Sequence, residues 1–583
     1  AGMPIPRAWR AVSYDVQQAA RPILVGGATN LPSGSRGQSE LERYARYMTL
    51  AEKAMKAAYL PGDNPALTAE EQIEYERLQG SEIVASMDSL DILASTRWES
   101  GVAHERLYVA NGVGGVSTLN LDDQNGLQVV GDVFQGGIVQ GLEQRGYALF
   151  GANTGEGGGQ RPDDCSATSV PGEARAVQAA NLTVSGDPVS LGNIVDIAGG
   201  EKLAYHQGWL YSAGVPGSAL WGPCPSTMAP ATADHPVSGN YGKISAVNLY
   251  DPLLTTQYDF ESSVFDIVHY SDYLIAALGE KGVAVVSRTN PDQRVYLSLD
   301  SQLQARPGKA LALRQLGNLL LVAAENGVVA VDLSEPLAPR VISAGNQEWI
   351  VGVDYFKDRL IAAGVDSGLQ TLQIPAAVVI ESNIPETGLL PDTADYSVRF
   401  NEPVTLVSLQ EAGAVTVNRR SDGASLPVSV SAVDLGEGSA TTFILEFDRT
   451  PGETYIVRID RASNLRGSGL WLPFTEEFTV APAGARQPVV YEVENGTYHR
   501  GHQDVITVRG EGFSELPSLQ VRVDQYPVTF ERLNSNTLQI PANALDVLPL
   551  TVGQHHLRIS DSGLTADFPG AIVTGAEPDS VEF

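Results

Sequence analysis

The amino-acid sequence predicts an all-β protein in which a β-propeller is followed by two smaller β domains. Short apolar strands that end in Gly-containing turns recur across the first two thirds of the chain. The composition is rich in turn formers, with 59 Gly and 34 Pro among 583 residues. The residues after these repeats contain two further β domains, which are predicted from the segments described below.

The charge balance argues against two classes of partner. Asp and Glu together number 69 and Lys and Arg 38, which gives a formal net charge of −31. An acidic surface repels phosphate backbones and anionic lipid headgroups. No stretch reaches the roughly 20 consecutive apolar residues that span a bilayer. We therefore expect no nucleic-acid partner and no membrane span in this chain.

Six copies of the repeat align on one leucine each. Each copy has a short apolar strand, a Gly-containing turn and, in most copies, a second apolar strand. The equivalent leucines lie about 40 to 64 residues apart, and the shorter spacings match one four-stranded propeller blade. They are Leu107, Leu149, Leu210, Leu274, Leu320 and Leu360.

The N-terminal segment is predicted to close the propeller ring. Ala11–Gly27 parallels Val329–Ala344, and the last copy, near Arg359, lacks its outermost strand. A propeller closes its ring by completing one blade from both chain ends, which removes open sheet edges. We therefore predict six blades, with seven as the alternative if an early strand is missing from this sequence.

The best-defined copy is AAENGVVAVDLSEPLAP, Ala323–Pro339. It resembles the LVIVD-type repeat of bacterial β-propellers, whose hallmark is A-x-x-x-G-h-x-h-h-D-h-S-x-P-x-x-P, where h is apolar. The resemblance covers roughly residues 8–376 and places the propeller domain at 1–378. It implies a surface or secreted bacterial protein and names no activity.

A helical pair is predicted to interrupt the propeller at about 38–80. Apolar residues in SELERYARYMTLAEKAMKAAYL follow a helical stripe that ends at Pro61-Gly62. Thr68 and Glu71 then form a capping box for a second helix, which stops at Gly80. The pair is either a lid or partner-docking element, or it simply packs its stripe against the propeller.

Residues 379–482 are predicted to form a β-sandwich. Within SNIPETGLLPDTADYSVRFNEPV, the run Phe400-Asn401-Glu402-Pro403-Val404 resembles the Phe-Ser-Glu-Pro-Val strand of the bacterial Ig-like domain found in S-layer proteins. The later segments PGETYIVRIDRASNLRGSGL and FTEEFTV resemble the closing strands of that family. The resemblance implies an Ig-like fold.

A second domain follows the linker APAGARQ. Residues 487–575 resemble the IPT/TIG Ig-like fold, with Ile506–Phe513 (ITVRGEGF) as the most recognisable piece and VGQHHLRISD as a late strand. Residues 576–583 are expected to be a linker to a further module. The chain would then be one segment of a larger protein.

The two cysteines bear on the compartment. Cys165 and Cys224 lie in Gly- and Pro-rich loops without a C-x-x-C motif or a neighbouring His. A disulfide between them is the preferred interpretation, and a metal site or two unremarkable thiols are the alternatives. A disulfide fits an extracellular, cell-surface or periplasmic protein. Residues 1–30 show no signal peptide, which indicates a mature form or an excised piece.

The common catalytic motifs are missing from the sequence. Gln160-Arg161-Pro162 follow glycines 157–159 where a P-loop requires Gly-Lys-Ser/Thr. No serine stands in a G-x-S-x-G motif, and Tyr108 occupies the second His position of an H-E-x-x-H motif that would begin at His104. We therefore name no catalytic residue and favour a protein that is not an enzyme.

Histidines gather in the last predicted domain. His499 and His502 would ligate a transition metal if a turn brought His555 or His556 near them. The alternative is that they are ordinary solvated surface histidines in a polar turn.

Calcium is the other cation considered. Asp123 and Asn125 stand at EF-hand spacing, but Asn-Gly between two apolar strands also specifies a hairpin turn, which we prefer. Asp163 and Asp164 form a further acidic loop without a fixed ligand spacing. No cofactor is predicted, and calcium stays open.

Two long loops form the largest candidate binding surface of the propeller. They are Gly151–Glu173 and Val215–Asn240, and Trp221, His235 and Tyr241 lie in or directly after the second. Aromatic side chains on exposed loops suit contacts with sugars or proteins. The alternative is that Trp221 only anchors its loop to the propeller.

The predicted function is that of a non-enzymatic segment of a large secreted or cell-surface bacterial protein. The propeller would be a platform for protein or glycan partners, and the Ig-like pair a spacer or stalk in adhesion or surface assembly. Two alternatives stay open: a hydrolase or lyase with its site in the propeller channel, and a structural element of a filament or surface layer.

Overall fold

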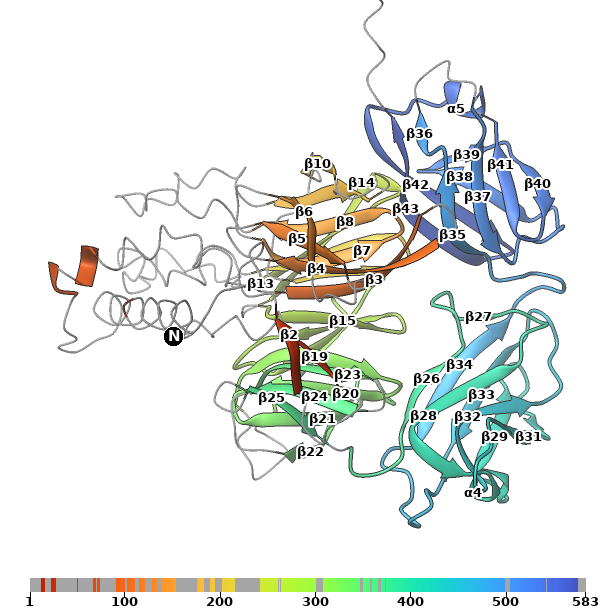
Figure 1. Cartoon of the computed structure of the whole chain (residues 1–583). Coiled ribbons are helices and arrows are strands. Elements are labelled where there is room, and N and C mark those ends of the chain that lie inside the picture. The colour runs from red at the N-terminus through yellow and green to blue at the C-terminus, as the bar shows by residue number, and fades with distance from the viewer. Residues whose placement is uncertain are drawn as a thin grey trace, which may run out of the picture. The chain divides into compact units, whose positions relative to one another are not determined.

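A computed structural model of the chain shows a protein built almost entirely of β-strands (Figure 1). It divides into two compact units. Unit 1 comprises Ala1–Tyr205, Leu210–Asn248 and Pro252–Phe265, and unit 2 comprises His206–Trp209, Leu249–Asp251 and Asp266–Phe583. The structure describes residues 12–15, 23–27, 50, 67–69, 71–73, 91–99, 102–110, 115–120, 128–134, 139–153, 176–182, 189–193, 202–214, 242–260, 262, 264–299, 308–345, 350–356, 359–364, 368–372, 374–498, 504–541 and 543–574.

Unit 1 consists of antiparallel meanders. Its sheets have the strand orders β3-β4-β5-β6, β10-β9-β8-β7 and β11-β12-β13-β14, and a separate hairpin pairs β1 with β2. The turns 206–209 and 249–251 of the third sheet belong to unit 2. The strands are β1 (Val12–Asp15), β2 (Ile23–Gly27), β3 (Asp91–Glu99), β4 (Val102–Ala110), β5 (Val116–Asn120), β6 (Gln128–Val133), β7 (Val139–Arg145), β8 (Ala148–Asn153), β9 (Ala176–Asn181), β10 (Val189–Asn193), β11 (Lys202–His206), β12 (Trp209–Gly214), β13 (Gly242–Asn248) and β14 (Asp251–Phe260).

Unit 2 begins with three further meanders. Two have four strands, β15-β16-β17-β18 and β19-β20-β21-β22, and the third, β23-β24-β25, has three (Figure 1). The middle strands of the two four-stranded meanders, β16, β17, β20 and β21, are almost wholly buried, as their Val-, Leu- and Ala-rich sequences lead one to expect. The strands are β15 (Asp266–Tyr270), β16 (Tyr273–Ala277), β17 (Val283–Ser287), β18 (Arg294–Leu297), β19 (Ala310–Leu316), β20 (Leu319–Ala324), β21 (Gly327–Asp332), β22 (Arg340–Gly345), β23 (Ile350–Phe356), β24 (Arg359–Gly364) and β25 (Gly368–Leu372).

The repeat in the sequence corresponds to one meander per copy. All six aligned leucines fall in the second strand of a meander, from Leu107 in β4 to Leu360 in β24. In two meanders a glycine begins the turn after the first strand: Gly146 and Gly317 have φ of 54° and 52°, a region that favours glycine. In both turns a glutamine side chain closes the loop, because Gln144 Nε2 and Gln315 Nε2 donate to the glycine carbonyls at 2.5 Å.

The predicted helical insertion is described only around its second cap. Thr68 N donates to Glu71 Oε2 at 2.9 Å and Glu71 N donates to Thr68 Oγ1 at 3.2 Å, which confirms the capping box. The rest of 38–80, apart from Leu50 and residues 67–73, lies outside the described residues.

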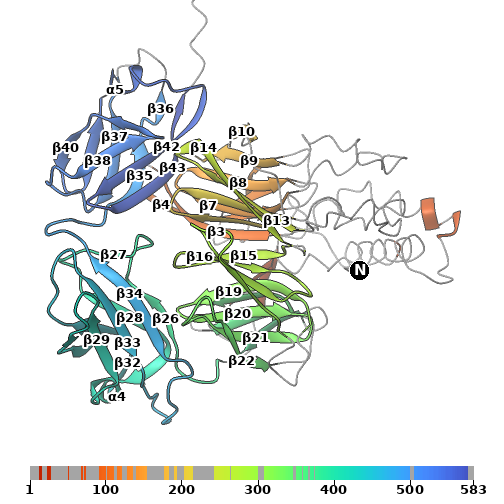
Figure 2. The ribbon, with the colours of Figure 1, turned by 180° about the vertical axis from the view of Figure 1, so that it is seen from behind.

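Two β-sandwiches complete unit 2, and they have the same topology (Figure 2). The first pairs the sheet β26-β28-β32-β31 with β27-β34-β33-β29-β30, and the second pairs β35-β37-β41-β40 with β36-β43-β42-β38-β39. In each, the short second strand runs parallel to the last strand. The core of the first contains stacked Tyr396 and Phe478, whose rings lie 5.0 Å apart.

The strand bounds of the first sandwich are β26 (Val379–Ser382), β27 (Leu389–Leu390), β28 (Tyr396–Thr405), β29 (Val415–Arg419), β30 (Ser425–Leu426), β31 (Ser429–Val433), β32 (Ser439–Glu446), β33 (Thr454–Ile459) and β34 (Phe474–Val480), with helix α4 (Leu406–Gln410) after β28. Those of the second are β35 (Val489–Glu494), β36 (Thr497–Tyr498), β37 (Ile506–Glu511), β38 (Leu519–Val523), β39 (Tyr526–Val528), β40 (Glu531–Asn534), β41 (Thr537–Ile540), β42 (Gly553–Asp561) and β43 (Leu564–Thr574), with helix α5 (Asn543–Asp546) before β42.

Candidate functional site

The first sandwich packs directly against the last meanders of unit 2, at a contact that we call joint 1. Joint 1 is formed by strands β19–β24 on one side and by residues 374–401 and 471–476 on the other. Ile380 and Leu472 of the sandwich share one buried apolar cluster with Leu316 and Tyr355 of the meanders. Because this cluster spans both bodies, separating them would expose apolar surface to water.

Two backbone contacts set the position of the sandwich at joint 1. Gly317 approaches the Val379 carbonyl so closely that a Cβ atom there would overlap the oxygen. The side chain of Asn401 accepts a hydrogen bond from Val378 N at 2.7 Å, while its carbonyl accepts one from Tyr355 Oη at 3.3 Å. Asn401 therefore links the exit from the last meander to the second strand of the sandwich sheet.

A polar network accompanies the apolar cluster of joint 1. Glu476 accepts hydrogen bonds from Ser382 Oγ at 2.7 Å and Tyr396 Oη at 2.8 Å. Burial raises the pKa of the Glu476 carboxyl, although both hydroxyl donors act in the opposite direction. On the meander side, Asn318 accepts from Tyr270 Oη at 2.9 Å and donates to Thr475 O at 3.3 Å. Burial and the nearby Glu476 also raise the pKa of Tyr270.

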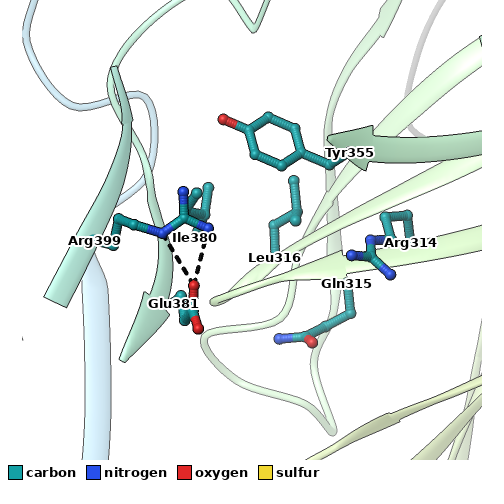
Figure 3. A pocket seen from close by; sticks show the side chains of 7 residues that line it. All are labelled: Arg314, Gln315, Leu316, Tyr355, Ile380, Glu381 and Arg399. Atoms are coloured by element: carbon teal, nitrogen blue, oxygen red, sulfur yellow. Dashed lines mark hydrogen bonds and ion pairs between the residues drawn. The ribbon is translucent and has the colours of Figure 1, made fainter. Parts of the chain in front are cut away.

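A pocket of about 330 Å³ opens within joint 1 (Figure 3). Leu316, Ile380 and Tyr355 are all buried and form its apolar part. Figure 3 shows Arg314 on one wall and the Arg399–Glu381 pair on the opposite wall, with Leu316 between them. The polar lining comes from both bodies, because β19 supplies Arg314 and Gln315 whereas β26 and β28 supply Glu381 and Arg399.

The charged side chains of the pocket are paired. Arg399 donates from Nε and Nη2 to Glu381 Oε2 at 3.0 and 2.9 Å, and the two residues are direct cross-strand partners. Arg314 Nε lies 3.2 Å from Asp354 Oδ1. Each of the two guanidinium groups is thus paired with a carboxylate, of which Glu381 belongs to the lining and Asp354 does not. The lining supplies hydrogen-bond donors and acceptors beside three apolar side chains.

The second sandwich has a different attachment, which we call joint 2. It consists of the turns His206–Trp209 and Leu249–Asp251 against strands β42 and β43. The Arg558 guanidinium lies 4.0 Å from the Tyr250 ring centre, and Tyr250 Oη donates to Leu557 O at 3.1 Å. Arg558 also binds both oxygens of Asp567, at 2.6 and 3.0 Å. Among the described residues, the polar contacts across joint 2 are thus those of Arg558 with the Tyr250 ring and with Gln207 O, at 3.4 Å, and that of Tyr250 with Leu557 O.

The linker between the two sandwiches is held at both ends. Gly484 N donates to Asp392 Oδ2 of the first sandwich at 3.2 Å, and Arg486 N donates to Asp561 Oδ2 of the second at 3.0 Å. Ala481, Ala485 and Leu564 form a small buried apolar cluster beside it. A linker with these contacts is an ordered connection rather than a flexible tether.

Most residues that the sequence singled out lie outside the described residues. These are the loop aromatics Trp221, His235 and Tyr241, the cysteines Cys165 and Cys224, and the metal candidates Asp123, Asn125, Asp163, Asp164, His499 and His502.

The structure does place the two remaining histidines, His555 and His556. His555 Nδ1 lies 2.6 Å from Asp524 Oδ2, and its Nε2 lies 2.8 Å from Thr551 O. Burial lowers the pKa of His555, but the Asp524 carboxylate outweighs burial and the net pKa is raised. His556 Nδ1 accepts from Gly570 N at 3.1 Å, and burial lowers its pKa to about 4. Both imidazole rings therefore make hydrogen bonds within the second sandwich.

Within the described ranges, no group of three or more His, Cys, Asp and Glu side chains is arranged to hold a metal ion. None of the helices in the same part of the chain has the length and apolar character that a bilayer crossing requires.

Sequence reasoning did not identify the pocket. The only local indication of it in the sequence is a pair of opposite charges, Glu381 and Arg399, on two strands of the first predicted sandwich. Arg314 and Asp354 belong to neighbouring meanders, and their pairing depends on how those meanders pack.

Comparison with known proteins gives structural resemblance only. No family model matches the sequence, and no curated protein matches it. Among solved structures, the chain is similar to the WD40 β-propeller domain of Doa1, with 12% identity over 53% of this chain and 88% of that one and a TM-score of 0.30. It is also similar to the computationally designed protein Ika8 (12% identity, 48% and 70% coverage, TM-score 0.31) and to a nidogen/laminin complex (12% identity, 44% and 85% coverage, TM-score 0.29).

Proposed function

We propose that this chain is a non-enzymatic binding segment of a large secreted or cell-surface bacterial protein. Its propeller has six blades and serves as the platform for a protein or glycan partner. The two sandwiches are Ig-like domains that orient this platform as an ordered spacer. The observation that carries the proposal is the pocket at joint 1, because ligand sites occur preferentially where two domains meet.

Further observations support the finer parts of the proposal. Six consecutive meanders, each with an aligned leucine in its second strand, agree with six blades. Both sandwiches have one four-stranded and one five-stranded sheet in the same strand order, which agrees with an Ig-like fold. The tied linker 481–487 agrees with a spacer of defined orientation. The loops that carry Trp221 and Tyr241 remain a proposed second contact surface.

The proposal is tested by probing a glycan and protein array with the whole chain and with the double variant Arg314→Gln/Glu381→Gln. We expect at least one partner whose binding is weakened about tenfold or more in the variant, because it loses two charged hydrogen-bonding groups. The thermal unfolding midpoint of the variant serves as the control for folding. The proposal fails if no partner binds, or if every partner binds the variant as tightly as the original chain.

A further inference from the structure

The pocket at joint 1 has an unusual charge environment for this chain. The chain carries a formal net charge of −31, whereas the pocket lining holds two arginines and one glutamate. Both arginines are ion-paired, Arg399 with Glu381 in the lining and Arg314 with Asp354 outside it, so the charges of the two pairs sum to zero. A ligand that binds here therefore meets arginines that already have a carboxylate partner.

The two ion pairs do not use all the hydrogen-bonding groups of their members. The two hydrogen bonds that Arg399 makes to Glu381 both end on Oε2, as the dashed lines in Figure 3 show. The closest atoms of Arg314 and Asp354 are Nε and Oδ1, 3.2 Å apart. A carboxylate has two acceptor oxygens and a guanidinium five N–H donors, and Gln315, which donates from Nε2 to Gly317 O, adds an amide oxygen to the lining. The lining therefore combines donors and acceptors with an apolar floor.

Charged ligands fit this arrangement poorly. An anion would have to compete with Glu381 or Asp354 for an arginine, and it would approach a strongly acidic chain. A cation would have to displace an arginine from its carboxylate. A purely apolar ligand would cover charged groups without satisfying them, which is costly. A neutral ligand with many hydroxyl groups can donate to Glu381 and accept from Arg314 without breaking either pair.

We propose that the pocket of Arg314, Gln315, Leu316, Tyr355, Ile380, Glu381 and Arg399 binds a neutral carbohydrate of one or two sugar rings. The apolar floor of Leu316, Ile380 and Tyr355 would face the C–H groups of a ring, and the paired charges would bind its hydroxyls. The volume of about 330 Å³ lies at the lower end of the range for small-molecule sites, which favours a short saccharide. This inference rests on the proposed binding function and names its ligand class.

The test is isothermal titration of the whole chain with matched sugars. Neutral probes are glucose, galactose, mannose and lactose, and the charged probes are glucuronate and glucosamine. We expect at least one neutral sugar to bind at least tenfold more tightly than both charged ones. Its Kd should change less than twofold between 50 and 500 mM NaCl, because salt screens charge attraction and leaves neutral hydrogen bonding largely unchanged.

Substitutions in the pocket test whether the sugar binds there. Arg314→Gln and Glu381→Gln should each weaken the neutral sugar about tenfold. The matched control is Arg458→Gln, which removes an exposed ion pair with Asp460 on the same sandwich and should leave the Kd unchanged. The inference is overturned if no neutral sugar binds, if glucuronate binds more tightly with a strong salt dependence, or if the control variant causes the same loss. Salt-dependent glucuronate binding that is lost in Arg314→Gln would overturn the carbohydrate inference and leave the proposed binding function standing. If every array partner bound the pocket variants as tightly as the original chain, that function would be refuted as well.

Discussion

The two sandwiches have the same strand order but are attached to their surroundings by opposite means. Joint 1 includes a shared buried apolar cluster and the half-buried carboxyl group of Glu476, and the backbone of Gly317 lies against the Val379 carbonyl. Joint 2 depends on the polar contacts of two side chains, Arg558 and Tyr250. Because the strand orders are the same, the topology alone does not decide how each sandwich is attached.

This difference predicts unequal tolerance to change. An apolar, closely packed contact responds strongly to added atoms, because neighbouring backbone cannot move without disturbing the cluster. A polar contact through one side chain responds mainly to loss of that side chain. The two joints should also respond to pH in opposite directions. Joint 1 contains an acid, Glu476, whose pKa is raised, and joint 2 contains His556, whose ring lies 5.8 Å from that of Tyr250 and whose pKa is lowered.

The largest expected effect is at Gly317. Gly317→Ala should destabilise unit 2 by about 2–4 kcal/mol, because alanine combines an unfavourable positive φ with overlap against the Val379 carbonyl. The measurement is the unfolding midpoint by calorimetry, together with protease cleavage at residues 374–378. Gly467→Ala is the matched control: Gly467 has φ of 81° with nothing near its Cβ position, and should cost about 1–2 kcal/mol. Equal losses in both variants would contradict a close contact at joint 1.

The next effect is at Arg558. Arg558→Lys keeps the charge but loses the planar group that stacks on Tyr250 and binds both oxygens of Asp567. We expect a loss of about 1–3 kcal/mol in the transition that includes the second sandwich. Arg509→Lys, at an exposed pair with Glu494 on the same sandwich, should cost less than about 0.5 kcal/mol. A loss at Arg558 no greater than at Arg509 would mean that joint 2 does not depend on this arginine.

A smaller, pH-dependent effect is expected at joint 1. Burial raises the pKa of Glu476, so its contribution to stability is fully present below the ordinary value of 4.5 and is lost as pH rises through the raised value. Glu476→Gln should flatten this part of the stability profile. The check is a set of denaturant titrations between pH 4 and 8, with Glu477→Gln, at the exposed neighbouring residue that pairs with Arg420, as the control. If the pH profile of stability were unchanged in Glu476→Gln, Glu476 would not be the source of the pH dependence.

Joint 2 should respond in the opposite direction. Burial lowers the pKa of His556 to about 4, so its contribution is fully present above the ordinary value of 6.5 and is lost as pH falls through about 4. Protonation would also remove the ring acceptor that binds Gly570 N. In His556→Gln, the loss of stability between pH 6.5 and 4 should be smaller than in the original chain. The same loss in both proteins would show that other groups govern the acid response of the second sandwich.

Local features of the fold were predictable because they depend on neighbouring residues. The repeat leucines mark the second strand of each meander, since alternating apolar strands and glycine turns are specified within a few residues. The Thr68–Glu71 capping box was predictable for the same reason, and both of its hydrogen bonds are present. In the Phe400–Val404 run that the sequence singled out, the side chain of Asn401 accepts a hydrogen bond from Val378 N.

The candidate site was not predictable in this way. The sequence draws attention to histidines, cysteines and aromatic loops, whereas the pocket uses arginines and a glutamate on regular strands. Only the cross-strand pair Glu381–Arg399 had a local signal, because the two residues are adjacent in register. The residue that completes the opposite wall, Arg314, lies on a separate meander.

The sequence by itself determined that the chain is nearly all β, that its first part repeats one meander, and that two further β domains follow. These properties depend on periodicity and turn chemistry, which act over short distances along the chain. Only the tertiary structure decided where the sandwiches attach, which charges neutralise one another in the pocket, and which ionisable groups are buried. Tyr250 and Leu557, whose hydrogen bond helps to form joint 2, are 307 residues apart. Contacts of this kind follow from the packing of complete domains, and no local pattern specifies them.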